Sequence, residues 1–383
     1  MFFECFLHKS FFVFYLESIL GLVEMKAKTF SAGLKHSLFL TEDYRVLVCG
    51  TELGTTVDGN SGRCTEIPQE VDLPDISSVA AGNEFSLYLD SIGNVWGSGS
   101  SSYGEFGIMG KYKEPIKLEN LPPIQSIQPS HNYYSVFLDV DGYVWSCGYN
   151  GYGQLGLGHL TTQFVPTKIE NIPKITSLST GFYHTLMIDE RGGVWGCGYN
   201  VYGQVGVKGL ENKLLPTQLH FPTPITTISA GDFHTFFIDE SESVWACGHN
   251  LCGQLGFGTN TDVLAPQKIE SLQRIVNISA GRSNGVFLDA DWNVWACGTA
   301  EYLRTSSSKP VRCNQLENIR ALSCTSHFLF LDGTSTIWVA GENSDGQLGM
   351  GNREKVPLPE RNANLPPIAG TLRYSTTKSA RKI

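Results

Sequence analysis

The chain has 383 residues, a formal net charge of −9 and a sequence pI of about 5.5. An acidic chain is a poor generic binder of nucleic acid, so the charge favours basic protein surfaces as partners. The length would suit two or three ordinary domains, but the sequence repeats itself, and a repeat that closes on itself forms one domain.

The first 25 residues precede the repeats and are rich in phenylalanine. Glu17 interrupts their apolar run, and a membrane-spanning helix needs roughly 20 apolar residues, so we expect no membrane segment. The stretch also lacks a good small-residue cleavage site, which argues against a signal peptide. Two interpretations stay open: an apolar segment in front of the domain, or a translation start at Met25 that leaves residues 1–24 unmade.

Seven copies of one motif follow. The clearest copies begin at the glycine of a Gly-x-x-His turn, and six of the seven carry a tryptophan 14 residues after this anchor, while all seven carry a glycine 17 residues after it. Successive anchors are 49, 49, 50, 50, 50 and 43 residues apart. Self-similarity at a fixed period is the signature of a repeat architecture. The seven anchors are Gly33, Gly82, His131, Gly181, Gly231, Gly281 and Cys324.

The fourth copy shows how one repeat divides into strands. We expect strands at residues 175–179, 185–188, 194–197 and 216–219, separated by a Gly-x-x-His turn, an Asp-initiated hairpin turn and an Asn-x-x-Gly-Gln loop. Antiparallel strands with turn residues roughly every 8–12 positions form a meander. Seven meanders that bury tryptophan and aliphatic faces on their neighbours predict an all-β fold, a seven-bladed β-propeller of four-stranded antiparallel blades, over residues 26–364.

A proline falls in the expected outer strand of every copy. Proline cannot donate to a strand ladder, so it suits an edge strand. These prolines are Pro68, Pro115, Pro166, Pro216, Pro266, Pro310 and Pro357. After the last one, residues 365–370 imitate the start of an eighth copy, so we expect a ring-closing strand within residues 365–383, followed by a basic tail.

The sixth copy departs from the pattern at residues 299–308, where its Gln-Leu-Gly loop is replaced. Tyr302, Leu303 and Arg304 combine an aromatic, an aliphatic and a cationic side chain, a composition typical of binding hot spots. The alternative is a surface loop that has drifted in sequence. Both interpretations stay open at this point.

Cysteine and aspartate recur at fixed repeat positions. Five cysteines share one position, which places them too far apart to bridge, so we expect packing residues in a reducing compartment. Six aspartates start hairpin turns, where they cap their own backbone instead of serving catalysis. The chain lacks a Cys-x-x-Cys pair and a phosphate-binding Gly-Lys-Ser/Thr loop, so we expect no metal, no cofactor and no covalent catalysis. The cysteines are Cys49, Cys147, Cys197, Cys247 and Cys297, and the aspartates are Asp90, Asp139, Asp189, Asp239, Asp289 and Asp332.

The string Gly-x-x-His-Thr…Gly-x-Val-Trp-x-x-Gly-x-Asn-x-x-Gly-Gln-Leu-Gly resembles the regulator of chromosome condensation repeat family, from residue 26 to about residue 364. The resemblance implies a seven-bladed propeller that binds proteins. The founding member of that family is a guanine-nucleotide exchange factor for the small GTPase Ran and docks on nucleosomes. Other members are scaffolds, parts of ubiquitin ligases, or an inhibitor of a β-lactamase.

Strand order decides which surface we expect to act. The Gly-x-x-His turns and the Asn-x-x-Gly-Gln loops end on the same rim, and loops held by a rigid scaffold usually carry binding. The histidines of these turns allow two interpretations: a ring that hydrogen-bonds backbone between blades, or a contact with a partner. They are His36, His184, His234 and His327.

The resemblance also implies particular contact residues. In the exchange factor, acidic and histidine side chains at these turns contact the GTPase. The turn at residues 231–235 resembles one such turn, and residues 82–85 resemble another, with Phe85 in place of its histidine. The exchange factor further uses a protruding wedge, for which residues 299–308 are our substitute. The predicted partner-binding residues are Asp232, His234, Glu84, His184, Tyr302 and Arg304.

The sequence therefore predicts a protein-binding regulatory propeller, and in its sharpest form a guanine-nucleotide exchange factor for a Ran-like small GTPase. An acidic rim and an inserted loop would displace Mg²⁺ and the phosphate-binding loop of the GTPase. The alternative is a non-catalytic scaffold or an enzyme inhibitor with an unrelated protein partner. Chromatin binding finds little support, because the chain has no basic arm. We expect a monomer in the cytoplasm, the nucleus or both.

Overall fold

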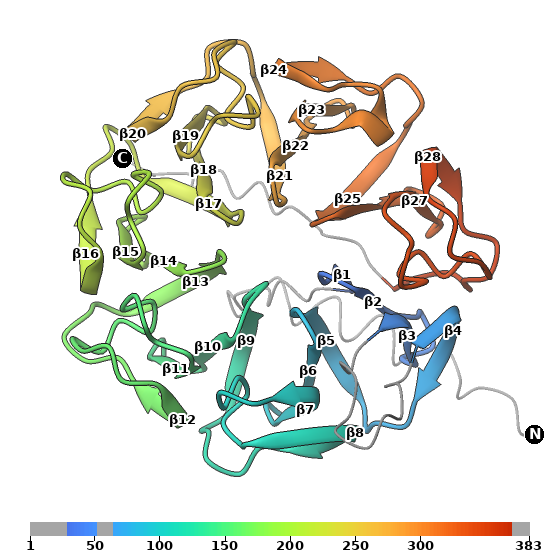
Figure 1. Cartoon of the computed structure of the whole chain (residues 1–383), viewed down its shortest axis with the longest axis horizontal. Coiled ribbons are helices and arrows are strands. Elements are labelled where there is room, and N and C mark those ends of the chain that lie inside the picture. Colours follow the sequence, from blue (N-terminus) through green and yellow to red (C-terminus); the bar gives the residue numbers. More distant parts are fainter. Residues whose placement is uncertain (1–28, 52–63, 370–383) are drawn as a thin grey trace, which may run out of the picture.

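Seven four-stranded antiparallel sheets surround a central axis in the computed structural model, which describes residues 29–51 and 64–369 (Figure 1). Within each sheet the strands lie in sequence order from the axis outward, so every blade is a simple meander. The predicted all-β, seven-bladed propeller is confirmed. Blades are numbered 1 to 7 along the chain.

Each blade contributes one strand to each of four concentric rings. The innermost strands are β1 (Phe30–Ala32), β5 (Ile76–Ala81), β9 (Ile124–Pro129), β13 (Ile175–Thr180), β17 (Ile225–Ala230), β21 (Ile275–Ala280) and β25 (Ile319–Cys324). The second strands are β2 (His36–Leu40), β6 (Phe85–Asp90), β10 (Tyr134–Asp139), β14 (His184–Asp189), β18 (His234–Asp239), β22 (Asn284–Asp289) and β26 (His327–Asp332). The third strands are β3 (Val46–Thr51), β7 (Val95–Ser101), β11 (Val144–Gly148), β15 (Val194–Gly198), β19 (Val244–Gly248), β23 (Val294–Gly298) and β27 (Ile337–Gly341). The outer strands are β4 (Cys64–Val71), β8 (Gly110–Lys117), β12 (Gln163–Lys168), β16 (Lys213–Leu219), β20 (Val263–Lys268), β24 (Ser307–Arg312) and β28 (Val356–Arg361), and the turn η1 (Glu301–Leu303) precedes β24.

The second strand of each blade is the most deeply buried, because neighbouring blades cover both of its faces. All six residues of β18 are buried, whereas the outer strand β20 is mostly exposed. Between blades 4 and 5, Leu186 packs with Phe237 in one buried cluster. Each fully buried side chain of this kind contributes about 1.5–3 kcal/mol, so the contacts between blades supply most of the stabilisation.

The third strand of each blade carries a glycine at or near its end, because the backbone there is left-handed. The φ angles of these seven glycines lie between 82° and 111°, a region that other residues rarely adopt. A Cβ atom at Gly148 would lie 2.4 Å from the carbonyl oxygen of Tyr133, in the adjacent turn. The repeated glycine therefore allows the third strand to pass close to the Gly-x-x-His turn. The other six are Gly50, Gly99, Gly198, Gly248, Gly298 and Gly341.

The aspartates of the hairpin turns are structural, as predicted. In blade 5 the Oδ1 atom of Asp239 accepts from the amides of Ser241 and Ser243, at 2.9 and 3.0 Å. Its Oδ2 atom accepts from Nε1 of Trp245 at 2.9 Å. Burial alone would raise the pKa of Asp239, but these hydrogen bonds outweigh it and lower the pKa. The repeated tryptophan and aspartate are thus one hydrogen-bonded pair.

The repeated cysteines connect neighbouring blades. The thiol of Cys297 in blade 6 donates to the carbonyl oxygen of Gln254 in blade 5, at 3.0 Å. Burial raises the pKa of the Cys197 and Cys297 thiols to about 12, so both stay protonated at neutral pH. All five are buried and free, as expected for packing residues.

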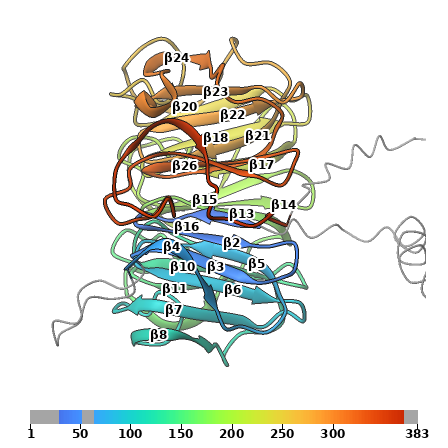
Figure 2. The same cartoon turned by 90° about the vertical axis from the view of Figure 1, so that its right-hand side faces the viewer.

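Blade 1 is closed by residues far apart in the sequence. Its inner strand β1 has three residues, whereas the other inner strands have six. Ile368 pairs with Thr41 at the end of β2, and the amide of Ala369 donates to the carbonyl of Leu40 at 2.9 Å. Ile368 is fully buried in a cluster with Phe30. Figure 2 shows blade 7 directly above blade 1, where these segments meet.

Some expectations concern segments outside the described residues. The apolar segment at residues 1–25 and the basic tail are among them, so both stay predictions, as do the domain boundaries. Across residues 29–51 and 64–369 no helix reaches the length and apolar character that a membrane span requires.

Candidate functional site

The Gly-x-x-His turns ring the mouth of a narrow central channel. The channel encloses about 90 Å³ and is lined by the inner strands. Serine side chains there accept hydrogen bonds from the next blade: Ser229 accepts from the amide of Ala280 at 2.9 Å, and Ser279 from that of Cys324 at 3.0 Å. The channel serines are therefore structural links between blades.

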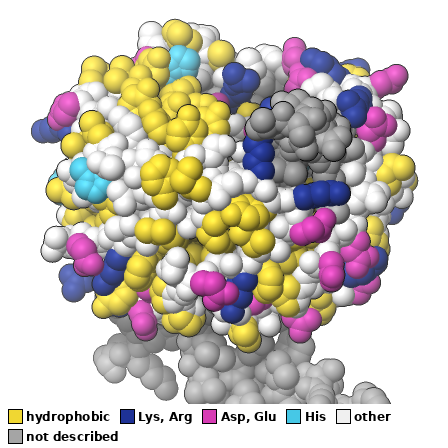
Figure 3. Space-filling view, turned by 60° about the horizontal axis from the view of Figure 1, so that its bottom comes forward, with side chains coloured by type: hydrophobic (Ala, Val, Ile, Leu, Met, Phe, Trp, Pro, Cys, Tyr) yellow, Lys and Arg dark blue, Asp and Glu magenta, His cyan; other side chains and the backbone are white. Residues whose placement is uncertain are grey.

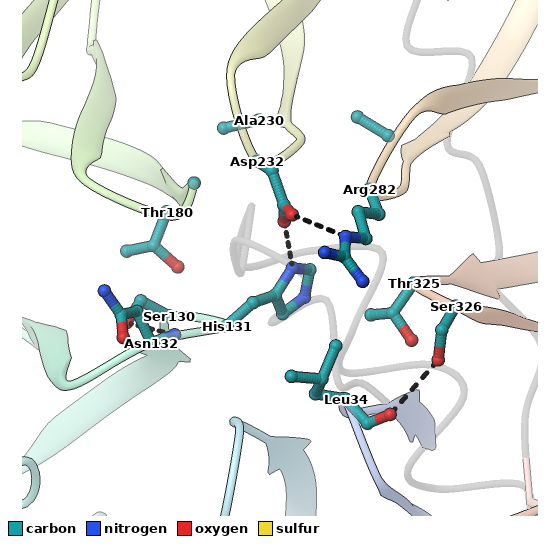
Figure 4. A network of polar contacts seen from close by, with 12 residues as sticks. Leu34, Ser130, His131, Asn132, Thr180, Ala230, Asp232, Arg282, Thr325 and Ser326 are labelled. Carbon is teal, nitrogen blue, oxygen red and sulfur yellow. Dashed lines mark hydrogen bonds and ion pairs between the residues drawn. The ribbon is translucent and has the colours of Figure 1, made fainter. Parts of the chain in front are cut away.

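Asp232 lies at the channel mouth between two cationic or titratable partners (Figure 4). Its Oδ1 atom is 3.6 Å from Nδ1 of His131 in blade 3, and its Oδ2 atom is 3.8 Å from Nε of Arg282 in blade 6. Only 5% of Asp232 is exposed. We expected Asp232 to contact a partner, but its carboxylate is buried and already paired with residues of this chain.

His184 and His234 are fully buried, so neither is placed to contact a partner. The hydroxyl of Thr235 donates to the carbonyl of Gln204 at 2.7 Å and therefore accepts from Nε2 of His184, at 3.0 Å. Nε2 of His234 donates to the carbonyl of Asn284 at 3.1 Å. Both rings link adjacent blades, which was the structural interpretation of the pattern. Their burial therefore argues against the prediction that His184 and His234 contact a partner.

Burial also determines the protonation of these two rings. It lowers the pKa of His184 to about 3 and that of His234 to about 4, because a charged imidazole loses its hydration there. Each Nδ1 atom is buried without a hydrogen-bond partner, which suits a neutral ring with its proton on Nε2. The histidines are therefore neutral at physiological pH.

Glu84 lies at the rim of blade 2 and is partly exposed. Its Oε1 atom accepts from Nζ of Lys35 in blade 1 at 2.8 Å. This hydrogen bond is the main cause that raises the pKa of Lys35 above its usual value. Of the predicted acids, Glu84 is the more accessible one, but it too has a partner.

The unusual loop of blade 6 is packed against the propeller. Leu303 is fully buried in the core between blades 6 and 7. The hydroxyl of Tyr302 donates to Glu342 at 2.6 Å, and Glu342 also pairs with Lys355 at 2.7 Å. Arg304 is exposed and ends η1 in a left-handed conformation, with φ of 54°. Residues 299–308 form a compact turn and not the wedge that we expected. Arg304 is the predicted contact residue that this turn exposes.

A continuous row of aromatic side chains covers the same rim over blades 2 to 5. Neighbouring ring centroids lie between 4.5 and 6.3 Å apart. We call this row the aromatic belt. It consists of Tyr103, Tyr133, Tyr149, Tyr152, Phe182, Tyr183, Tyr199, Tyr202, Phe233 and His249.

The belt is open to solvent. Tyr103 is 41% exposed and Tyr133 is 37% exposed, while the other rings are half-buried. Among the described residues, none of its seven tyrosine hydroxyls has a hydrogen-bond partner. In the space-filling view, hydrophobic side chains gather in the upper left, with charged side chains mainly around and below them (Figure 3). Large exposed apolar surfaces of this kind mark interaction sites.

None of the predicted contact residues belongs to the belt, although the sequence carries a signal for it. The residues two positions after the anchor include Tyr133, Tyr183 and Phe233 in blades 3 to 5. The residues 18 positions after the anchor include Tyr149 and Tyr199 in blades 3 and 4. The signal for the belt therefore lies in the variable positions of the repeat and not in the repeated ones.

Another hollow, of about 650 Å³, lies on the opposite rim at blade 4. Its walls include Arg191, Trp195, His220 and Phe221. None of the six predicted partner-binding residues lines it. Over the described part of the chain, no three metal-binding side chains lie close enough together to hold an ion.

The chain is similar to known protein families, to a curated protein and to solved structures. Residues 132–370, more than half of the chain, match the RCC1-like domain, and residues 76–105 match the regulator of chromosome condensation (RCC1) repeat. A curated relative, the human probable E3 ubiquitin-protein ligase HERC6, is 32% identical over 107 residues. That match covers 26% of this chain and 10% of the ligase, so the chain spans about a tenth of this relative.

Solved structures agree on the fold. Yeast RCC1 (Prp20), solved bound to Kap60, gives a TM-score of 0.73 at 18% identity, covering 94% of this chain and 91% of its own. Human WBSCR16 gives 0.72 at 20% identity, covering 82% and 88%. Prp20p from Saccharomyces cerevisiae, described with its binding to Gsp1p and histones, gives 0.68 at 21% identity, covering 78% and 80%. These likenesses show the fold, and the family matches identify the chain as a member of the RCC1-like domain family, built from RCC1 repeats.

Proposed function

We propose that this protein is a regulatory propeller that binds a protein partner through the aromatic belt. The observation that carries the proposal is the belt itself, in which ten rings form one partly exposed surface on a rigid scaffold. Tyrosine gives large contact area at a low cost in conformational entropy, and aromatic residues are enriched at the centres of interfaces. The protein acts by binding and carries out no covalent chemistry.

The second candidate function is guanine-nucleotide exchange on a Ran-like small GTPase. Family membership and an acid directly after the anchor glycine, Asp232, favour it. In this arrangement a GTPase would have to replace Arg282 as the partner of Asp232, and Glu84 would have to leave Lys35. The scaffold and inhibitor hypotheses need no such exchange of partners. We therefore place exchange after plain protein binding.

Location and further partners follow as parts of the same proposal. A protein that binds other proteins through a neutral aromatic surface suits the cytoplasm, the nucleus or both. Chromatin remains the weaker partner, because the chain is acidic overall, at −9.

A capture experiment with the full chain tests the proposal. Wild-type protein, a Tyr152→Ser/Tyr202→Ser variant and a Tyr44→Ser control serve as baits in a cell extract. Tyr44 is 69% exposed in the turn between β2 and β3 of blade 1, which begins at Thr41 and lies on the opposite rim. We expect a partner that wild type and control retain and the belt variant loses. Partners held equally by all three baits would contradict the proposal.

The exchange hypothesis needs its own measurement. Release of a fluorescent GDP analogue from purified Ran is followed with and without the propeller, and capture is repeated with EDTA and with Mg²⁺ and GTP. Exchange predicts accelerated release and preferential capture of the nucleotide-free GTPase. Unchanged release together with equal capture in both buffers would remove exchange and leave a scaffold or inhibitor.

A further inference from the structure

The aromatic belt offers hydrogen-bond donors without charge. Its seven tyrosine hydroxyls have no partner among the described residues, and no lysine, arginine, aspartate or glutamate belongs to the belt. A ligand matched to this surface must accept hydrogen bonds and present apolar groups.

The rings are tilted against one another, so the belt presents both faces and edges. Tyr152 and Tyr199 meet at 67°, Phe182 and Tyr183 at 90°, while Tyr103 and Tyr133 meet at 41°. Every ring pair of the belt is tilted or edge-on, and none is stacked. A flat, stacked surface would suit planar ligands, whereas this arrangement suits a ligand with repeated ridges.

Acidic groups bordering the belt are already engaged. Glu84 pairs with Lys35, and Asp232 pairs with Arg282 and His131. A cationic segment would therefore meet aromatic faces without an unpaired carboxylate from either residue. Charge complementarity thus favours an uncharged ligand.

These properties describe a polyproline II helix. Its backbone carbonyls have no internal partners, its proline rings are apolar, and proline supplies no competing amide donor. Proline-rich segments dock on aromatic surfaces in several recognition modules because the helix is already ordered before binding. Ten residues in this conformation span about 31 Å.

We propose that the aromatic belt binds an extended, uncharged, proline-rich segment of a partner protein, with tyrosine rings against proline rings and tyrosine hydroxyls donating to peptide carbonyls. This inference rests on the proposed function and names the chemistry of its partner. It concerns the four adjacent blades 2 to 5 of the rim.

Labelled peptides test the proposal directly on the full chain. Fluorescein-labelled decaproline, a (Gly-Ser)₅ peptide and decaarginine are titrated with the protein and followed by fluorescence anisotropy. We expect saturable binding of decaproline and none of (Gly-Ser)₅. Absence of decaproline binding overturns the proposal. Tighter binding of decaarginine that the belt variant abolishes also overturns it, in favour of a cationic partner.

Variants separate the rings from the hydroxyls. Tyr152→Ser with Tyr202→Ser should weaken decaproline binding on the order of tenfold, and Tyr→Phe at both positions by about threefold. Tyr44→Leu on the opposite rim should change nothing. An unchanged affinity for decaproline in the serine variant would contradict the assignment. Thermal unfolding checks each fold, and the phenylalanine pair keeps the test decisive if the serine pair unfolds.

Two outcomes distinguish this inference from the function on which it rests. If the belt variant loses captured partners while decaproline never binds, protein binding stands and the proline-rich ligand is wrong. If the belt variant keeps both its captured partners and its decaproline binding, the proposed function and the proline-rich ligand are both wrong.

Discussion

The two halves of the Gly-x-x-His rim differ in chemistry although both are built from the same repeat. Two residues after the anchor, blades 3 and 4 carry Tyr133 and Tyr183, whereas blades 6 and 7 carry Ser283 and Ser326. In blades 3 and 7 the loops beneath these side chains share the same hydrogen bond. The amide of Tyr152 donates to Oε1 of Gln154 at 3.0 Å in blade 3, and in blade 7 the equivalent bond joins Asp345 and Gln347 at 2.9 Å.

This difference separates what the fold needs from what it leaves free. Positions that shape the backbone hold the same residue in nearly every blade. Positions that only face solvent are free to vary, and an aromatic residue placed there in consecutive blades is not required by the fold. The belt is therefore the part of the rim that folding does not explain.

The largest expected effect would show that the halves share one scaffold. Gly148→Ala in blade 3 and Gly298→Ala in blade 6 should each lower the free energy of unfolding by about 3 kcal/mol. Each new Cβ would lie within 2.4 Å of a carbonyl oxygen, and φ is positive at both positions. Urea unfolding measures the loss. A loss confined to one half would mean that the scaffold is not equivalent around the ring.

The loss of stability at low pH should likewise be similar in both halves of the rim. Burial lowers the pKa of His184, in blade 4, and of His327, in blade 7, to about 3. Protons bind these rings in the unfolded chain near pH 6.5 but not in the native state, so stability is full above pH 6.5 and falls as the pH drops. At pH 5 each buried histidine should cost about 2 kcal/mol.

Asparagine variants measure that cost. Blade 6 carries Asn284 at the same position, so the site accepts an amide. His184→Asn and His327→Asn should each shrink the difference in unfolding free energy between pH 7.5 and pH 5 by about 2 kcal/mol. An unchanged difference would mean that the rings do not stay neutral in the folded protein.

Much of the fold could be predicted because its determinants are local. The glycine, tryptophan and aspartate columns each serve a contact within one repeat or with the next, such as Trp245 with Asp239, so their spacing is enough to identify the blade. The seven prolines of the repeats all fall in outer strands, as predicted from the local preference of proline for edge strands.

The candidate site could be predicted only in part. Sequence places Asp232, His184 and His234 on the correct rim but does not give their depth. His131 reaches Asp232 across the channel from a blade 101 residues earlier, and no pattern within one repeat reports such a pairing. The compact form of the blade 6 turn depends similarly on Leu303 reaching a core between two blades.

Ion pairs at the channel mouth connect the two halves, and we expect them to contribute little. Asp232→Asn should change the free energy of unfolding by less than about 1 kcal/mol, because Arg282 is 70% exposed and solvent screens the pair. The amide also avoids the cost of burying a charge. Thermal unfolding at low and high salt provides the measurement. A loss above about 3 kcal/mol would instead assign the carboxylate a structural role.

The smallest expected effect extends the belt by one ring. Cys252 is exposed in blade 5 and occupies the position of Tyr152 and Tyr202 in blades 3 and 4. Cys252→Tyr places a ring beside His249 and should tighten decaproline binding by about threefold. Asp345→Tyr makes the same change in the polar half, where no neighbouring ring of the belt receives it, and should leave affinity unchanged. Equal gains in both variants would show that any exposed tyrosine suffices, and that contiguity of the belt is not what the ligand recognises.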